Sequence, residues 1–338
     1  MATVLPRPLC FGPDEHPVLD SVLPAAAAAE SVETDLDAIR SVASWMAYEE
    51  LPEPAYLLPF RFDSREQLID FVLVSALLNF AFTDFDTGTR FDVSYEGRVY
   101  ADADALFACL HRALVEGTDV LDGAVLAGLD AGDLRRIFRD GTIEIPLLEE
   151  RVRILNEAGA TLVERWDGHF HHLVDAASER LWDDGRGLID LLLRDFPRWR
   201  DVVELDGRTV RLYKLAQLAV WMLHATLRDH GGLRVVDLHR LTAFADYIVP
   251  AALEVLGILR YSEPLRETIL GRRELEQGGR WEVEIRAHTI VASALLCDAV
   301  NELRPPELQV IAPRIDARLW VPFHATHRPH HLVRTVMY

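Results

Sequence analysis

The segment REQLIDFVLVSALLNFAF, residues 65–82, decides the fold. Beyond its polar start, apolar side chains cover nearly every face that a helix would present. A helix that is apolar all round is typical of the buried centre of a helical protein. The segment therefore predicts a central helix around which other elements pack.

Helical patterns continue on both sides of this segment. Residues 33–51 place Leu36, Ile39 and Val42 on one face of a helix. Comparable patterns occur at residues 103–117, 131–140, 146–166, 171–196, 212–229, 251–259 and 262–275. Residues 280–303 are expected to start extended and become helical, and the tail from residue 313 to begin as a helix or turn and end irregular.

Only two segments predict β-hairpins, with turns at Glu96-Gly97 and Asp206-Gly207. These strands are too few for a parallel sheet, and no glycine-rich phosphate-binding motif opens a helix. The predicted fold class is mainly α, a single helical body with two small β-hairpins. Residues 1–30, rich in Pro and Ala, are expected to be an irregular N-terminal extension, and residues 31–338 one helical domain.

Composition and charge narrow the classes of partner. The chain has 338 residues and a net charge of −19, with 54 acidic against 35 basic residues. Nucleic-acid binding needs clustered Lys and Arg, so no nucleic-acid partner is expected. The apolar windows are too short to span a membrane, no signal peptide is visible, and three separated cysteines indicate a reducing compartment. We expect a soluble, cytoplasmic protein whose oligomeric state the sequence leaves open.

Two groups of histidines have the spacing of metal ligands. They are His169, His171 and His172 in the first group and His324, His327, His330 and His331 in the second. Zinc sites use three or four ligands in fixed geometry, and neither group has the HExxH pattern or a cysteine nearby. We interpret both groups as solvated or hydrogen-bonding histidines and predict no metal site.

Other common catalytic patterns find little support. No GxSxG motif is present, and Cys109 lies in an apolar helix where a small core residue is expected. The stretch LLEERVRIL, residues 147–155, indicates a solvated helix face with Glu/Arg pairs three or four residues apart. The residues alone favour a surface role for Lys214, its stem lying along apolar neighbours.

Asp246 and Asp316 differ from the other acids because apolar and aromatic residues surround both. Burying a carboxylate is unfavourable unless it is paired or hydrogen-bonded. Either residue could cap a helix or pair with an arginine, or could hold a cation, orient water or stabilise developing positive charge. Residues 238–245 indicate a helix, and Pro250 disfavours helical geometry at Val249, so Asp246 is expected near a break between two helices.

Longer blocks of the sequence, in their order along the chain, resemble the queuosine salvage family, the queuosine 5′-phosphate N-glycosylases/hydrolases that release the base queuine. The blocks are LNFAF (78–82), VSYEGRVY (93–100), LHRALVEG (110–117), FPRWRD (196–201), LYKLAQ (212–217), LTAFADYIVPAALEVLGILRYS (241–262), EVEIRAHTI (282–290), IDARLW (315–320) and PHHLVRTVMY (329–338). The resemblance implies a mainly helical fold resembling DNA glycosylases and a reaction that needs no metal or redox cofactor.

The resemblance also implies roles for individual residues. The family pattern FADYR-P is met by Phe244, Ala245, Asp246, Tyr247 and Pro250, with Ile248 in place of the basic residue. Asp246 is then the expected catalytic carboxylate, which would stabilise positive charge on the ribose and accept a proton from the attacking water. Phe244 is expected to hold the flat base by stacking or apolar contact, and Tyr247 is a further candidate for substrate binding.

Three further blocks extend the expected site. Lys214 in LYKLAQ is a second catalytic candidate and a candidate ligand of the 5′-phosphate. Asp316 is expected to pair with the secondary amine of queuine, and Trp320 to contact the base. His331 and Arg334 meet the terminal P-H--R pattern and are further phosphate candidates.

Two positions depart from the family pattern. Val321 replaces the second acid of the family's LDYYLWD block, and Thr83 stands where an aromatic residue is usual. The expected function is hydrolysis of queuosine 5′-phosphate, with that nucleotide as substrate and queuine as product. The alternatives are a protein that binds queuine or another deazapurine without turnover, and a nucleic-acid lesion glycosylase, which the net charge disfavours.

Overall fold

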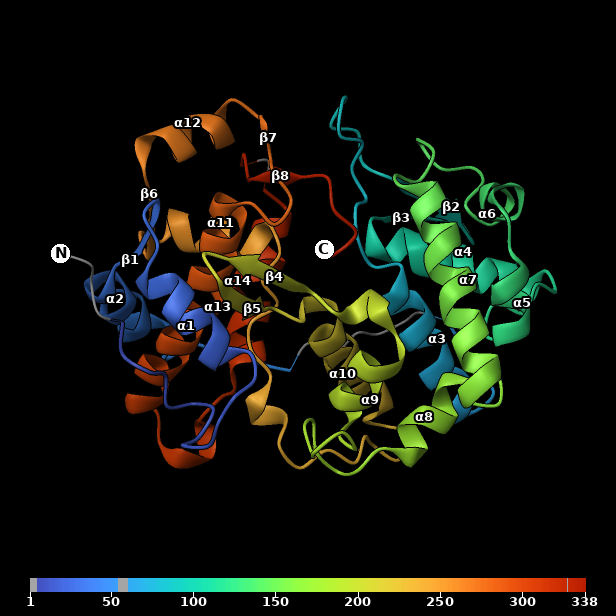
Figure 1. Ribbon diagram of the computed structural model, residues 1–338, viewed down its shortest axis with the longest axis horizontal. Helices are drawn as coiled ribbons and strands as arrows, with labels where there is room; N and C mark the ends of the chain where they lie inside the picture. The colour runs from blue at the N-terminus through green and yellow to red at the C-terminus, as the bar shows by residue number, and fades with distance from the viewer. Residues whose placement is uncertain (1–4, 54–59, 327) are drawn as a thin grey trace. The chain divides into compact units, whose positions relative to one another are not determined.

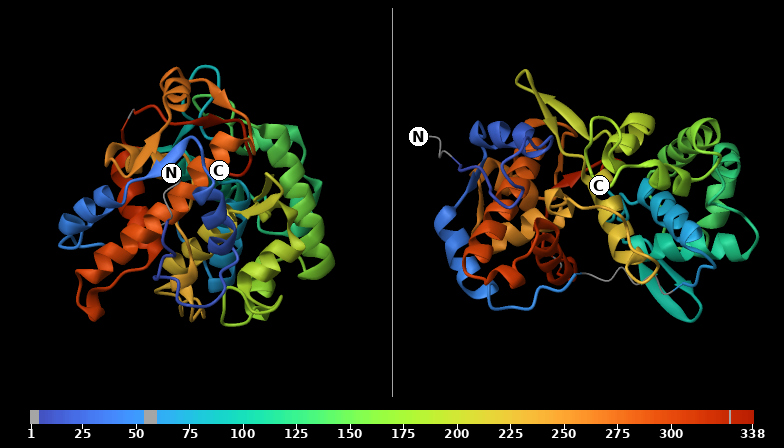
Figure 2. Two further views of the ribbon diagram at one scale, coloured as in Figure 1. Left: turned by 60° about the vertical axis from the view of Figure 1, so that its left-hand side comes forward. Right: turned by 90° about the horizontal axis from the view of Figure 1, so that it is seen from below.

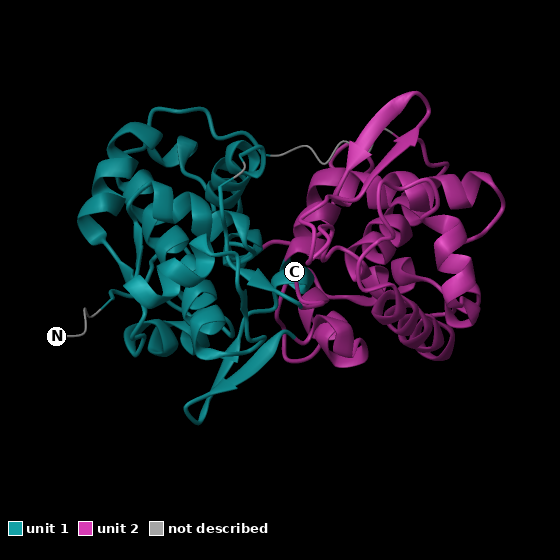
Figure 3. Ribbon diagram, turned by 90° about the horizontal axis from the view of Figure 1, so that it is seen from above, with its two compact units in different colours: residues 1–54, 201–217, 237–334 teal, residues 55–200, 218–236, 335–338 magenta. Residues whose placement is uncertain are grey.

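The structure is a computed structural model that describes residues 5–53, 60–326 and 328–338. Its described elements are mainly helices, accompanied by two-stranded sheets (Figure 1), which confirms the predicted fold class of mainly α with small hairpins. The chain forms two compact units (Figure 3). Unit 1 holds residues 1–54, 201–217 and 237–334, and unit 2 holds residues 55–200, 218–236 and 335–338. In the described ranges, no helix is both long and apolar enough to cross a membrane.

Unit 1 is built around its longest helix, α13, which packs against α1, α2 and α14 (Figures 1 and 2). Its elements are α1 (Leu19–Ala27), β1 (Val32–Thr34), α2 (Leu36–Met46), β4 (Val202–Leu205), β5 (Arg208–Arg211), η2 (Leu238–Arg240), α11 (Ile248–Val255), β6 (Leu259–Tyr261), α12 (Glu263–Leu270), β7 (Glu274–Leu275), α13 (Arg280–Glu302), η3 (Pro306–Leu308), α14 (Ala312–His324) and β8 (Leu332–Val333). The helix α10 (Lys214–Leu227) begins in unit 1 and continues in unit 2.

The start of α13 corrects one prediction, because residues 280–303 were expected to begin extended and the helix begins at Arg280. The alternation of apolar and charged residues there resembles a strand, but both kinds of residue are buried on this helix. The charged ones have partners: Glu284 accepts hydrogen bonds from the backbone N–H groups of Glu30 at 3.0 Å and Ser31 at 2.7 Å. Buried charges with such donors are tolerated in a helix interior.

Unit 2 is built around α3 (Arg65–Leu77), where residues 68–77 are all buried as predicted for a central helix. Its other elements are β2 (Asp92–Tyr95), β3 (Arg98–Ala101), α4 (Ala103–Val115), α5 (Gly123–Gly128), α6 (Ala131–Ile137), α7 (Leu148–Arg165), α8 (Phe170–Ala176), α9 (Leu188–Asp195) and η1 (Pro197–Trp199). Both predicted hairpins are confirmed, as the antiparallel pairs β2–β3 and β4–β5.

Arg151 on α7 corrects a second prediction. The LLEERVRIL stretch was expected to be a solvated face, yet the Arg151 side chain is fully buried. Its guanidinium donates to backbone carbonyls at the end of α3 and in the following turn, including Leu78 at 2.6 Å and Ala81 at 2.9 Å. Such carbonyls lack helical partners and carry partial negative charge, so they suit a buried cation. Arg153 does lie on the exposed face, paired with Glu157 at 2.9 Å.

Candidate active site

The segment before α11 carries Asp246 and has no regular secondary structure from residue 241 to residue 247. The sequence predicts a helix that continues to a break near Val249, but the structure has only the short η2 before this segment and starts α11 at Ile248. Pro250 is the third residue of that helix, where its missing N–H would have no helical partner. The break therefore spans residues 241–247 and contains Asp246 as predicted, whereas Val249, where helical geometry was disfavoured, belongs to α11.

The Asp246 carboxylate is buried and accepts three hydrogen bonds. Its Oδ1 accepts from the backbone N–H groups of Ile248 at 2.8 Å and Val249 at 3.0 Å. Its Oδ2 accepts from the indole N–H of Trp320, on α14, at 2.8 Å. Three N–H donors, two of them at the N-terminus of a helix, stabilise a negative charge on this side chain.

The second carboxyl group, Asp316, has a different environment on the same helix as Trp320. Its Oδ2 accepts the backbone N–H of Phe244 at 2.8 Å. Burial raises the pKa of Asp316 well above its usual range, the charge of Asp246 raises it further, and the Phe244 N–H and Lys214 oppose the rise. The two carboxyl groups therefore lie in different environments, and a difference of environment is how paired acids take distinct chemical roles.

Lys214 opens α10 beside these acids. Its side chain is buried, and this burial lowers the pKa of its ammonium group, while Asp246, Asp316 and Asp201 oppose the decrease. Tyr213, directly before it, has a left-handed backbone with φ of 48°, which is costly for a bulky residue and persists where surrounding structure requires it. The chain turns sharply at this point to place the lysine in the cluster.

Lys214 is also the single lysine among the 35 Lys and Arg residues of the whole chain. Arginine stays charged in proteins, whereas lysine is a compact ammonium whose pKa shifts readily on burial. A chain that uses arginine at every other basic position therefore retains lysine where that difference matters. This count is a signal for the site that motif reading of the sequence missed.

Arg286 on α13 links the Asp246 segment to the chain before β4. Its guanidinium binds both carboxylate oxygens of Asp201, one of them at 3.1 Å, and its Nε donates to the carbonyl of Ala245 at 3.1 Å. Glu282 lies one helical turn earlier, at 3.5 Å from Arg286. This buried, bidentate pair fixes the backbone immediately before Asp246.

Acids outnumber bases in this cluster. Within the described part of unit 1 it contains four carboxyl groups and two cations: Asp201, Asp246, Glu282 and Asp316 against Lys214 and Arg286. Even with a proton on Asp316, three carboxylates face two cations. An excess of negative charge in a buried region favours a ligand or transition state that carries positive charge.

Gln217 is a further residue that positions the segment. Its side-chain oxygen accepts the backbone N–H of Thr242 at 2.9 Å, and its amide nitrogen donates to the carbonyl of Leu212 at 3.0 Å. Both Gln217 and Thr242 are fully buried. Gln217 therefore joins the chain before Lys214 to the chain before Phe244, a role that its place in the LYKLAQ block did not reveal.

The predicted aromatic residues lie in the same region. The Phe244 ring is buried, while Tyr247 stacks on His330 with ring centroids 4.4 Å apart. The ring of Trp320 stacks on that of His324, with ring centroids 4.2 Å apart. His324 and His330 belong to the second histidine group, and His327 of that group lies outside the described residues.

The structure separates the three phosphate candidates. Lys214 lies among acids, as described above. Burial, together with His330 and Arg286, lowers the pKa of His331 to about 3, so its imidazole is neutral at physiological pH. Arg334 is half-exposed and pairs with Glu274 at 3.0 Å, where β8 runs parallel to β7. Lys214, Asp246 and Asp316 thus form one cluster, and His331 interacts electrostatically with Arg286 beside it.

Comparison with known proteins gives a consistent picture. A family model described as queuosine salvage protein matches residues 59–338. A protein of Sphaerobacter thermophilus is 36% identical over 318 residues, covering 92% of this chain and 94% of its own. A protein of Bos taurus is 34% identical over 239 residues, covering 70% of this chain and 69% of its own. A protein of Mus musculus is 32% identical over 280 residues, covering 77% of this chain and 81% of its own. All three are named queuosine 5′-phosphate N-glycosylase/hydrolase.

Proposed function

The chain belongs to the queuosine salvage protein family, and we propose on that premise that it hydrolyses the N-glycosidic bond of queuosine 5′-phosphate and releases queuine. The observation that supports this most is the buried Asp246 carboxylate, held by three N–H donors beside Lys214 and Asp316. The same names are carried by relatives in bacteria and animals.

Asp246 has the environment that cleavage of a glycosidic bond requires. Departure of the base builds positive charge on the ribose, as in oxocarbenium-like transition states of sugar hydrolysis. A fixed carboxylate stabilises that charge without reorganisation and can accept a proton from the attacking water. The products are then queuine and ribose 5-phosphate, and water is the only co-reactant.

Lys214 and Asp316 have supporting parts in this proposal. The ammonium group of Lys214 lies in the field of Asp246, Asp316 and Asp201, so we assign it to holding the charge balance of the site. A phosphate placed there would meet this excess of carboxyl groups, which disfavours Lys214 as its ligand. Asp316 is our candidate for the secondary amine of queuine, because a cationic amine nearby would lower its raised pKa and ionise it.

The remaining residues are assigned to binding. Phe244, Tyr247 and Trp320 would contact the base, with Trp320 also orienting Asp246 through its indole N–H. Arg334 is the candidate cation for the 5′-phosphate, and the neutral His331 offers it a hydrogen bond rather than a charge. The absence of a basic run in the sequence agrees with a small substrate carrying one phosphate.

The proposal is tested by incubating the purified protein with queuosine 5′-phosphate and, separately, with queuosine, and by following free queuine by chromatography. We expect release from the phosphate form, and slower release from the nucleoside because the phosphate contact is lost. Binding of queuine with no release from either substrate would support the alternative of a non-catalytic binding protein. Release from queuosine alone would show that the protein does not bind the 5′-phosphate of its substrate.

A further inference from the structure

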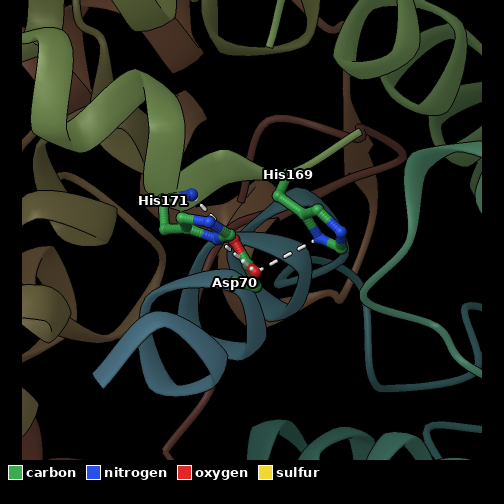
Figure 4. Close-up of side chains that lie close together, drawn as sticks. All are labelled: Asp70, His169 and His171. Carbon is green, nitrogen blue, oxygen red and sulfur yellow. Dashed lines mark hydrogen bonds and ion pairs between the residues drawn. The ribbon is translucent and has the colours of Figure 1, made fainter. Parts of the chain in front are cut away.

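Three side chains with metal-binding atoms lie together in unit 2, where α8 begins next to α3 (Figure 4). Asp70 comes from the middle of α3, His169 directly precedes α8, and His171 lies in its first turn. One ligand atom from each lies within 4.8 Å of the others. The cluster is separate from the residues assigned to base release, which belong to unit 1.

The distances in this cluster are close to those of a metal site. Asp70 Oδ2 lies 2.8 Å from His171 Nδ1 and 3.4 Å from His169 Nδ1. Zinc bonds of about 2.0–2.1 Å in tetrahedral geometry place neighbouring ligand atoms about 3.3 Å apart. To bind an ion, the Asp70 and His171 ligand atoms would have to move apart by about half an ångström, and the two imidazoles would have to move closer together by a somewhat larger distance.

His169 has a feature that hydrogen bonding leaves unexplained. Its Nδ1 is buried, and within the described ranges no hydrogen bond to this atom is formed. Asp70 already accepts the backbone N–H of His171 at 2.7 Å and contacts its ring nitrogen. Without an ion, the Nδ1 atom of His169 therefore faces a carboxylate that already binds His171. A cation placed between Asp70, His169 and His171 would have all three as ligands.

Access and ligand chemistry agree with an ion at this position. The Asp70 side chain is 4% exposed, whereas His169 is 31% and His171 17% exposed, so the carboxylate lies at the bottom and solvent reaches the imidazoles. Two neutral imidazoles and one carboxylate are a common ligand set for zinc and related divalent ions, with water in the fourth position. Three protein ligands and an entry path are what a credible site needs.

We propose that Asp70, His169 and His171 bind one divalent transition-metal ion of the zinc class. The ion fastens the start of α8 to the middle of α3 and has no part in base release. This differs from the prediction of no metal site, because the sequence shows the two histidines but not the aspartate, which lies about 100 residues earlier in an apolar helix. The proposal does not depend on the proposed function.

The test uses the full chain without a histidine tag, stripped of metal with a chelator and titrated with Zn²⁺ in a calorimeter. We expect one ion per chain with a dissociation constant on the order of micromolar or tighter. His169→Ala should weaken binding at least about tenfold, and Asp70→Asn at least as much. His239→Ala, which removes an exposed histidine of unit 1, is the matched control and should bind as the wild type does.

Two further readouts separate a built site from surface binding. Co²⁺ should give the visible absorption of a four-coordinate ion in the wild type and lose it in His169→Ala. Zinc should raise the melting temperature of the wild type by about 2–4 °C and leave that of His169→Ala unchanged. Since His169 is partly exposed, this variant is expected to fold. Failure of the wild type to bind zinc, or undiminished binding by His169→Ala, would overturn the proposal.

Discussion

Arg151 in unit 2 and Arg286 in unit 1 are both almost completely buried, but their partners differ. The Arg151 guanidinium donates to the backbone carbonyls of Leu78, Phe80, Ala81 and Pro146. Arg286 instead binds the Asp201 carboxylate and the Ala245 carbonyl. One cation neutralises the end of a helix, and the other belongs to a group of acids.

This difference indicates where chemistry can occur. Carbonyl groups do not titrate, so the partners of Arg151 hold the chain in place without changing charge, although burial lowers the pKa of Arg151 itself to about 9. The acids near Arg286 and Lys214 can exchange protons, and the pKa of Asp316 is raised while that of Lys214 is lowered. Shifted pKa values concentrated in one buried group of residues are typical of a catalytic site. Burial of charge alone would not have distinguished the two units.

The largest effect on stability is expected from Arg151→Met. The variant leaves several buried carbonyls without donors, so the free energy of unfolding of unit 2 should fall by about 3–5 kcal/mol. Urea unfolding measures the change, and Arg153→Met on the same helix is the control, expected to change stability by less than about 0.5 kcal/mol. A loss below about 1 kcal/mol for Arg151→Met would show that the carbonyls do not need this cation.

Lys214→Met should lower the rate of base release at least about 100-fold, because the acids lose the cation that balances them. Lys214→Arg is expected to fail to restore the rate, since a planar guanidinium does not fit the place of a compact ammonium. The single lysine also allows a direct check: one ¹⁵N-lysine side-chain signal should titrate below the usual lysine range. A rate for Lys214→Arg equal to that of the wild type would reduce the role of Lys214 to its charge.

Acid should destabilise unit 1 through its buried histidines, and His16 is the clearest case. Its Nε2 donates to the Arg240 carbonyl at 2.7 Å, its Nδ1 accepts the N–H of Leu19 at 3.1 Å, and burial lowers its pKa to about 4. The unfolded chain takes up a proton near pH 6.5, so the stabilisation is complete above that pH and is lost as pH falls toward 4.

Between pH 7 and pH 5 the loss from His16 should be about 2 kcal/mol. His16→Gln keeps a donor and an acceptor but does not titrate, so the variant should lose less stability over this range than the wild type. Urea midpoints at the two pH values give the comparison. Equal losses in the two proteins would mean that His16 is already charged in the folded state or does not contribute.

Trp320→Phe should have the smallest effect of this series. It removes the indole N–H that binds Asp246 and keeps an aromatic ring, so kcat should fall about tenfold with little change in KM. A change in KM alone would indicate that Trp320 contacts the base and does not orient the carboxylate.

Local features of the fold were predictable from the sequence. Both hairpin turns have two residues with left-handed φ, 49° and 75° at Glu96-Gly97 and 51° and 71° at Asp206-Gly207, which a short sequence signature identifies. The pairs β1–β6 and β7–β8 were not predicted, because each joins segments far apart in the chain and too short to give a period. Arg151 was misjudged for a related reason: alternating Glu and Arg suggest a wet face, and only the packing of distant carbonyls shows otherwise.

In the candidate site, too, individual residues were predictable from the sequence and the contacts between distant segments were not. Asp246 and Asp316 were identified from their apolar surroundings, and Lys214 from its motif block. Their meeting in one cluster, and the contribution of Gln217, depend on contacts across long stretches of chain that spacing does not encode. The raised pKa of Asp316 depends on burial and on the neighbouring charge of Asp246, so it too required the structure.

The central claim is that Asp246 is the catalytic carboxylate of a nucleotide hydrolase. The most direct measurement is a single-turnover assay of Asp246→Asn with saturating protein and queuosine 5′-phosphate, with ligand binding measured in parallel. Binding should persist while base release falls on the order of 1,000-fold or more, and Asp37→Asn, at an exposed position on α2, should match the wild type. Release by Asp246→Asn within about tenfold of the wild-type rate would contradict the claim.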